Sequence, residues 1–190
     1  RLLVQDGVYA EFAAELARRV ESMTVGSGDQ QGVVIGPLIN AAAVAKVEGL
    51  VNDAATHGAR ILTGGRRHDA GPNYYAPTVL GDVTPEMPIA QEEIFGPVAP
   101  LFRFSDEASA IRIANDTPYG LAAYFYARDI GRVWRVAEAL EYGIVGINEG
   151  IISTEVAPFG GVKESGIGRE GSRYGIDDYI EIKYLCMGGL

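Results

Sequence analysis

The sequence predicts an α/β protein built on a mainly parallel, twisted sheet with helices on both faces. Two observations predict this class: short apolar segments alternate with amphipathic ones, and the amphipathic segments run for roughly ten to seventeen residues. Strands separated by helices of that length form βαβ units, because a parallel connection must return to the starting end of the sheet. In such sheets, ligands bind beyond the C-terminal ends of the strands.

The first part of the chain alternates strand and helix. A strand is expected over 2–5, and Asp6 is placed to cap a helix that ends near Met23. The predicted apolar face of this helix repeats every four residues and consists of Val8, Phe12, Leu16 and Val20, with Ala13 and Ala17 beside them. A second helix over 41–57 ends before Gly58. Its predicted inward positions are Val44, Val47, Leu50, Val51 and Ala54.

The rest of the chain continues this alternation. Further strands are expected at 59–63, 74–83, 99–104, 121–127 and 144–148. Helices are expected at 105–115 and 130–141, and the inward positions of the second are Val133, Val136, Ala137 and Leu140. Residues 179–185 alternate with period two, which predicts a half-buried strand with a free edge. Such an edge is a candidate for pairing across a subunit interface.

Composition narrows the classes of partner. The 190 residues are 47% hydrophobic and 22% charged, which is ordinary for a globular protein, and their net charge is −9. An acidic chain is poorly suited to bind nucleic acid or an anionic membrane. Cys186 is the only cysteine, so neither an internal disulfide nor a cysteine metal cluster is expected, and no metal site is predicted.

The stretch 88–98 joins two acids to an aromatic residue and a turn. Glu92 and Glu93 are followed by Phe95, and Gly96 and Pro97 then constrain the backbone. One interpretation is a rigid bend that presents a carboxylate and an aromatic ring to a ligand with hydroxyl groups and a flat ring. The alternative is a charge pair at a helix end, followed by a core phenylalanine and an ordinary turn.

A second glycine-rich stretch is misleading. Residues 166–171 (GIGREG) match the GxGxxG pattern, but the dinucleotide fingerprint needs an apolar strand immediately before it. Lys163, Glu164 and Ser165 stand there instead, so these glycines are interpreted as turn residues. The long loop after the strand 144–148 is a better functional candidate, because loops that leave strand ends often carry function.

Four motifs together resemble the aldehyde dehydrogenase superfamily, and the resemblance covers essentially the whole chain. They are 91–97 (QEEIFGP), 115–121 (NDTPYGL), 158–166 (PFGGVKESG) and 168–170 (GRE). Within the superfamily the chain looks most like the succinate-semialdehyde dehydrogenases, on 150–153 (GIIS) and 178–186 (DYIEIKYLC). The resemblance implies that residues 1–164 form most of the catalytic domain. Residues 165–190 would form a C-terminal tail with an oligomerisation strand.

The resemblance also implies roles for four residues. Glu93 would bond the hydroxyls of the nicotinamide ribose, and Phe95 would pack near the nicotinamide. Ser153 would bond the far carboxylate of the substrate, and Phe159 would line the aldehyde tunnel. The alternatives are a loop serine that bonds its own backbone and a phenylalanine that simply packs in the core. Asn148 and Lys163 are interpreted as structural.

The expected cofactor is NAD or NADP, held mainly by a dinucleotide-binding domain that the resemblance places ahead of Arg1. The nucleophilic cysteine and the general-base glutamate are placed there too, so no catalytic residue is expected in 1–190, and the isolated chain is expected to be inactive. The expected partners are a small aldehyde and further copies of the chain, as a homodimer or homotetramer through the C-terminal strand. The expected location is the cytoplasm, or the mitochondrial matrix in a eukaryote. A different aldehyde substrate and a non-catalytic assembly role remain as alternatives.

Overall fold

The computed structural model describes residues 1–189 and forms two compact units, Arg1–Ile113 and Ala114–Leu190. This division reflects contacts within the chain. The predicted boundary between residues 164 and 165 separates the catalytic domain from the C-terminal tail of the family fold, and it stays a prediction. Within the described residues, no helix is both long and apolar enough to cross a membrane.

The first unit contains a four-stranded sheet in the order β1-β4-β3-β2. Its strands are β1 (Leu2–Gln5), β2 (Arg60–Thr63), β3 (Thr78–Gly81) and β4 (Val98–Phe104). β4 runs parallel to both of its neighbours, β1 and β3, whereas β2 is antiparallel to β3. The prediction of a mainly parallel sheet is therefore confirmed here, with one antiparallel edge strand.

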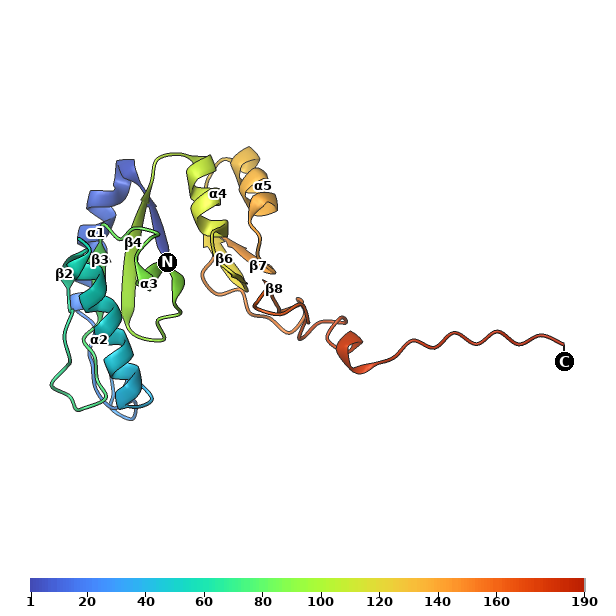
Figure 1. Cartoon of the computed structure of the whole chain (residues 1–190), viewed down its shortest axis with the longest axis horizontal. Helices are drawn as coiled ribbons and strands as arrows, with labels where there is room; N and C mark the ends of the chain where they lie inside the picture. The colour runs from blue at the N-terminus through green and yellow to red at the C-terminus, as the bar shows by residue number, and fades with distance from the viewer. Residues whose placement is uncertain (190) are drawn as a thin grey trace. The chain divides into compact units, whose positions relative to one another are not determined.

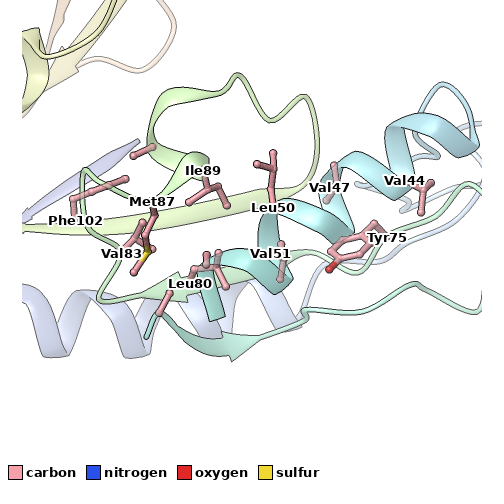
Figure 2. Packing of buried hydrophobic residues seen from close by; sticks show 13 residues of the cluster. Val44, Val47, Leu50, Val51, Tyr75, Leu80, Val83, Met87, Ile89 and Phe102 are labelled. Carbon is pink, nitrogen blue, oxygen red and sulfur yellow. The ribbon is translucent and has the colours of Figure 1, made fainter. Parts of the chain in front are cut away.

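Helices cover both faces of this sheet, as the sequence predicts (Figure 1). They are α1 (Asp6–Glu21), α2 (Ala41–Thr56) and the short α3 (Pro88–Gln91). Successive residues of β3 enter different cores, because side chains alternate along a strand. Val79 joins the cluster around α1, and Leu80 joins the cluster around α2. Figure 2 shows this second cluster, in which α2 and α3 pack against the sheet.

The prediction for α2 is confirmed in detail. Asn40 caps the helix by accepting a hydrogen bond from the amide of Ala43 at 2.9 Å, and His57 and Gly58 follow its end. Gly58 has a φ of +102°, a conformation that favours glycine. The buried residues of α2 are the five predicted ones, Val44, Val47, Leu50, Val51 and Ala54.

The prediction for α1 is confirmed for Ala13 and Val20, but it is wrong for Val8 and for the cap. The buried residues are Tyr9, Ala13 and Val20, whereas Val8 is 53% exposed. A spacing of four residues turns about 40° beyond one full turn, so a strict four-residue repeat drifts around a helix, whereas the mixed spacing from Tyr9 to Val20 does not. Asp6 is the first helical residue, and Gln5 occupies the cap position without a side-chain cap bond.

Tyr75 is the one large polar side chain of the α2 core, and its hydroxyl has no hydrogen-bond partner within the described chain. The side chain is 1% exposed. Burial, with a smaller contribution from Glu48, raises the pKa of Tyr75 to about 12. A buried hydroxyl without a hydrogen-bond partner lowers the free energy of unfolding by about 1–3 kcal/mol. Its removal is therefore tolerated better than the removal of a hydrogen-bonded hydroxyl.

We therefore expect Tyr75→Phe to leave the free energy of unfolding unchanged or to raise it by up to about 1 kcal/mol near neutral pH. Because the folded pKa lies above the unfolded one, the wild type loses stability as the pH rises from about 10 toward 12, and the variant lacks this loss. Urea unfolding at pH 8 and pH 11 measures both effects. Tyr126→Phe, at a tyrosine that is 73% exposed, is the matched control. A clear destabilisation by Tyr75→Phe at pH 8 would contradict this assignment.

The second unit contains a βαβ element and a short antiparallel pair of strands. β6 (Ala122–Phe125) and β7 (Ile144–Ile147) are parallel and are joined through α5 (Ile130–Ala139). β5 (Tyr119–Gly120) pairs antiparallel with β8 (Val162–Lys163). The helix α4 (Glu107–Asn115) leads into this unit. The predicted inward positions of α5 are half-buried rather than buried, and they are Val133, Val136, Ala137 and Leu140.

The tail differs from the predicted strand within this single chain. A 3-10 helix spans Asp177–Tyr179, and residues 180–189 form neither helix nor strand. Figure 1 shows this red segment as an extended thread. Its side chains are exposed, including Ile182 at 96%. The predicted half-buried strand thus has no partner strand within the described chain. Its pairing with another subunit stays a prediction.

Candidate functional site

The predicted bend begins where α3 ends. The amide of Glu92 donates to the carbonyl of Pro88 at 2.9 Å, which closes the helix, and the chain then turns extended at Glu92. Lys46 of α2 donates a hydrogen bond from its ammonium to the carbonyl oxygen of Glu93. Ile94 packs against the α2 core. The backbone of Glu93 is therefore fixed, while its side chain stays exposed.

Phe95 projects from this bend instead of filling the core. Its ring is 76% exposed and its φ is +46°, which is unusual for a residue other than glycine. At the next residue, a Cβ on Gly96 would lie 2.5 Å from Cγ2 of Val47, so only glycine lets the chain pass so close to α2. The alternative of a core phenylalanine is wrong, because Ile94 takes the inward position.

The bend can bind a ligand that combines hydroxyl groups with a flat apolar ring. An ionised carboxylate accepts hydrogen bonds from both hydroxyls of a diol, and an exposed aromatic ring stacks on another ring. Glu93 and Phe95 carry these groups on one short, pinned segment. Strained backbone at an exposed ring is typical of binding sites. The chemistry of these two side chains thus fits a nicotinamide riboside.

Ser153 lies in the loop that leaves the C-terminal end of β7. Residues 151–154 form neither helix nor strand, and Ser153 is exposed. The start of the loop is fixed by Asn148, whose side chain bonds the amide and the carbonyl of Ala127 at 2.9 and 2.8 Å. The structural role predicted for Asn148 is confirmed. Within the described chain Ser153 makes no hydrogen bond to its own backbone, and its hydroxyl is available to a ligand.

Phe159 lies further along the same loop and lines an open hollow of about 540 Å³. The residue is 37% exposed, so it is not simply packed in the core. Its backbone forms an antiparallel bridge with Glu170. Other residues that line the hollow are Leu121, Gly161, Arg169 and Tyr179. An aromatic wall of this kind suits an apolar part of a small ligand.

The structure groups the four predicted residues into two pairs. Glu93 and Phe95 share the bend of the first unit, and Ser153 and Phe159 share the loop of the second. Their predicted roles toward a ligand remain predictions. The predicted structural role of Lys163 is confirmed, because its ammonium bonds the carbonyls of Asn115 and Thr117 and pairs with Glu141 at 2.6 Å.

Sequence reasoning missed two residues that hold these segments. Lys46 pins the bend of Glu93 from 47 positions away, and Arg169 binds three backbone carbonyls around Phe159. No local pattern signals a side chain that bonds a distant carbonyl. For Arg169 the adjacent glycines were the one available signal, since they mark a close approach of the backbone.

The chain is similar to known proteins over almost its full length. Residues 1–185 match the aldehyde dehydrogenase family. The chain is 62% identical over 188 residues to the succinate-semialdehyde dehydrogenase [NADP(+)] GabD of Escherichia coli (strain K12), which covers 99% of this chain and 39% of that protein. It is 57% identical over 190 residues to a glutarate-semialdehyde dehydrogenase of Pseudomonas aeruginosa, covering 100% of this chain and 39% of that protein.

A solved structure agrees with the fold. The crystal structure of succinate-semialdehyde dehydrogenase from Burkholderia pseudomallei superposes on the chain with a TM-score of 0.95 at 61% identity, over 98% of this chain and 39% of that one. The chain therefore spans about two fifths of the length of these relatives. The predicted α/β architecture is confirmed.

Proposed function

The chain belongs to the aldehyde dehydrogenase family, and from this premise we propose that it forms the C-terminal part of an NAD(P)-dependent succinate-semialdehyde dehydrogenase. The enzyme would oxidise succinate semialdehyde to succinate. The observation that carries the proposal is the pinned bend that exposes the Glu93 carboxylate and the Phe95 ring together. The 62% identity to a dehydrogenase of that name supports the substrate.

The proposed role of the bend is to orient NAD or NADP. The carboxylate of Glu93 accepts hydrogen bonds from the ribose hydroxyls, and the Phe95 ring restricts the nicotinamide to one orientation. When bound, the nicotinamide supplies the acceptor for the hydride of the aldehyde. The exposure of Phe95 in a left-handed backbone conformation supports a ring that is covered by a ligand rather than by the core.

The proposed role of the 149–161 loop is to bind the substrate. The hydroxyl of Ser153 donates to the carboxylate at the far end of the aldehyde, and such charge-assisted bonds are among the stronger ones. Phe159 provides an apolar wall against the methylene groups between the two ends. The exposed hydroxyl of Ser153 and the hollow beside Phe159 support this assignment.

The proposed partner of the tail is another copy of the chain. Residues 180–189 are extended without a strand partner, and Ile182 and Tyr184 are 96% and 84% exposed. A segment of alternating apolar residues buries one face when it adds to the edge of a sheet. A homodimer or homotetramer held through this segment follows from the proposal.

Glutarate semialdehyde is the second candidate substrate. The observation in its favour is the 57% identity to a dehydrogenase of that name. Both aldehydes end in a carboxylate, so Ser153 fits either, and they differ by one methylene group. Discrimination by one methylene is worth roughly 1–3 kcal/mol, or about tenfold to two-hundredfold in kcat/KM.

The proposal is tested by measuring kcat/KM of the full-length enzyme for succinate semialdehyde, glutarate semialdehyde and the neutral aldehyde butanal. We expect the highest value for succinate semialdehyde and a much lower one for butanal. A higher value for glutarate semialdehyde would select the second substrate. An equal value for butanal would contradict a carboxylate-binding role for this chain.

A further inference from the structure

The two ends of the loop that follows Phe159 are joined by backbone hydrogen bonds. The amide of Phe159 donates to the carbonyl of Glu170 at 2.9 Å, and the amide of Glu170 donates back to the carbonyl of Phe159 at 2.7 Å. Residues 160–169 therefore form a loop whose two ends are tied beside the phenylalanine. Val162 and Lys163 in the middle of this loop pair with β5, and a side chain of the other arm bonds the segment next to Phe159.

One side chain holds the loop from within. Nη1 of Arg169 donates to the carbonyls of Gly161, Ile167 and Gly168 at 2.6, 2.9 and 3.0 Å. These carbonyls lie on both arms of the loop, on either side of its tip. Hydrogen bonds from a charged donor are stronger than neutral ones, so this single guanidinium ties the two arms together.

The stem of Arg169 also occupies the space that glycine leaves open. A Cβ on Gly160 would lie 2.7 Å from Cδ of Arg169, and it would come closer still to the carbonyl oxygen of Gly168. Gly160 is the residue immediately after Phe159, so the arginine packs directly against the backbone that sets the ring. Removing the side chain would leave both a gap and unbonded carbonyls at that point.

We infer that Arg169 is a positioning residue for the aldehyde site, which acts through Phe159 by locking the loop 159–170. This inference rests on the proposed function, because it takes Phe159 to be a wall of the substrate site. Loss of Arg169 loosens the wall, weakens the binding of every aldehyde that contacts it, and leaves the chemical step largely intact.

The test uses the full-length enzyme with Arg169→Met, which keeps much of the apolar stem, and Arg169→Lys, which keeps the charge and donors on a shorter stem. We expect Arg169→Met to raise the KM for succinate semialdehyde about fivefold or more, with kcat changed by less than about twofold. The lysine variant is expected to lie between the methionine variant and the wild type. The KM for the dinucleotide stays unchanged, and butanal is affected like succinate semialdehyde.

Arg173→Met is the matched control, because Arg173 is exposed and donates to the hydroxyl of its neighbour Tyr174 at 2.7 Å. It is expected to behave as wild type. A double-mutant cycle with Phe159→Leu then separates positioning from general stabilisation. If Arg169 acts through Phe159, its replacement adds less than about twofold to KM in the Phe159→Leu background.

Additive effects in the cycle, or a KM for Arg169→Lys and Arg169→Met equal to that of the wild type, would overturn the inference. Should Arg169→Met fail to fold, Arg169→Lys carries the cycle, and 19F NMR of a fluorinated Phe159 reports its ring directly. A resonance unchanged by Arg169→Lys would likewise overturn it. If the proposed function itself fails, the wild-type enzyme shows no preference for succinate semialdehyde over butanal, whatever the cycle gives.

Discussion

The 190-residue chain on its own is expected to form NAD(P)H from succinate semialdehyde at least about a thousandfold more slowly than the full-length enzyme. The proposed reaction needs a thiolate nucleophile, and Cys186 is the only thiol in the 190 residues. Cys186 is exposed and lies in the segment 180–189 that forms neither helix nor strand. Its sequence neighbours Leu185 and Met187 provide no base to activate it.

The measurement is the rise of absorbance at the nicotinamide band with equal concentrations of the isolated chain and the full-length enzyme. Cys186→Ser in the full-length enzyme is the control, and it is expected to keep the wild-type rate. Turnover by the isolated chain, together with loss of the wild-type rate in full-length Cys186→Ser, would mean that this thiol is a nucleophile after all.

Glu93→Gln in the full-length enzyme is expected to raise the dissociation constant of the dinucleotide roughly tenfold or more. The amide keeps the shape of the side chain, but it accepts hydrogen bonds from ribose hydroxyls without a charge. The fold should not change, because the contact that pins this residue is made by its carbonyl with Lys46, not by its carboxylate. Titration of the protein with the cofactor, followed by fluorescence, measures the change.

The neighbouring carboxylate gives a matched control for that experiment. Glu92 is also exposed, but it lies at the end of α3 and no role in binding is proposed for it. Glu92→Gln should leave the dissociation constant within about twofold of the wild type. Equal weakening by both substitutions would contradict a specific role of the Glu93 carboxylate.

Hydrophobic spacing predicted α2 far better than α1, and the difference has a physical origin. The inward residues of α2 follow mixed spacings of three and four, which stay on one side of a helix. The expected face of α1 was centred on a repeat of four that starts at Val8, so it missed Tyr9, although Ala13 beside that repeat is buried. Tyr9 is accepted inside because its hydroxyl accepts from the amide of Asp82 at 2.7 Å, which a local pattern cannot reveal.

Local sequence patterns also identified the candidate residues, but they did not predict the hydrogen bonds that hold their backbone in place. The order of Glu93, Phe95 and Gly96 indicated a bend, and the bend exists. The supports from Lys46 and Arg169 could not be predicted, since each links a side chain to backbone carbonyls set by the three-dimensional path of the chain. The tail shows a different limit of sequence patterns. The alternation of apolar residues over 179–185 predicts a strand, but a strand forms only where the edge of another strand is available to pair with it.

The most direct test of the proposed function is the effect of Ser153→Ala on two substrates of the full-length enzyme. Loss of a hydroxyl that donates to a carboxylate is expected to raise the KM for succinate semialdehyde by about tenfold or more, while the KM for butanal stays within about twofold. Ser22→Ala, which removes a hydroxyl that bonds the carbonyl of Arg19 on the surface, should change neither value. Equal changes for succinate semialdehyde and butanal would contradict the assignment of Ser153 as the residue that binds the substrate carboxylate.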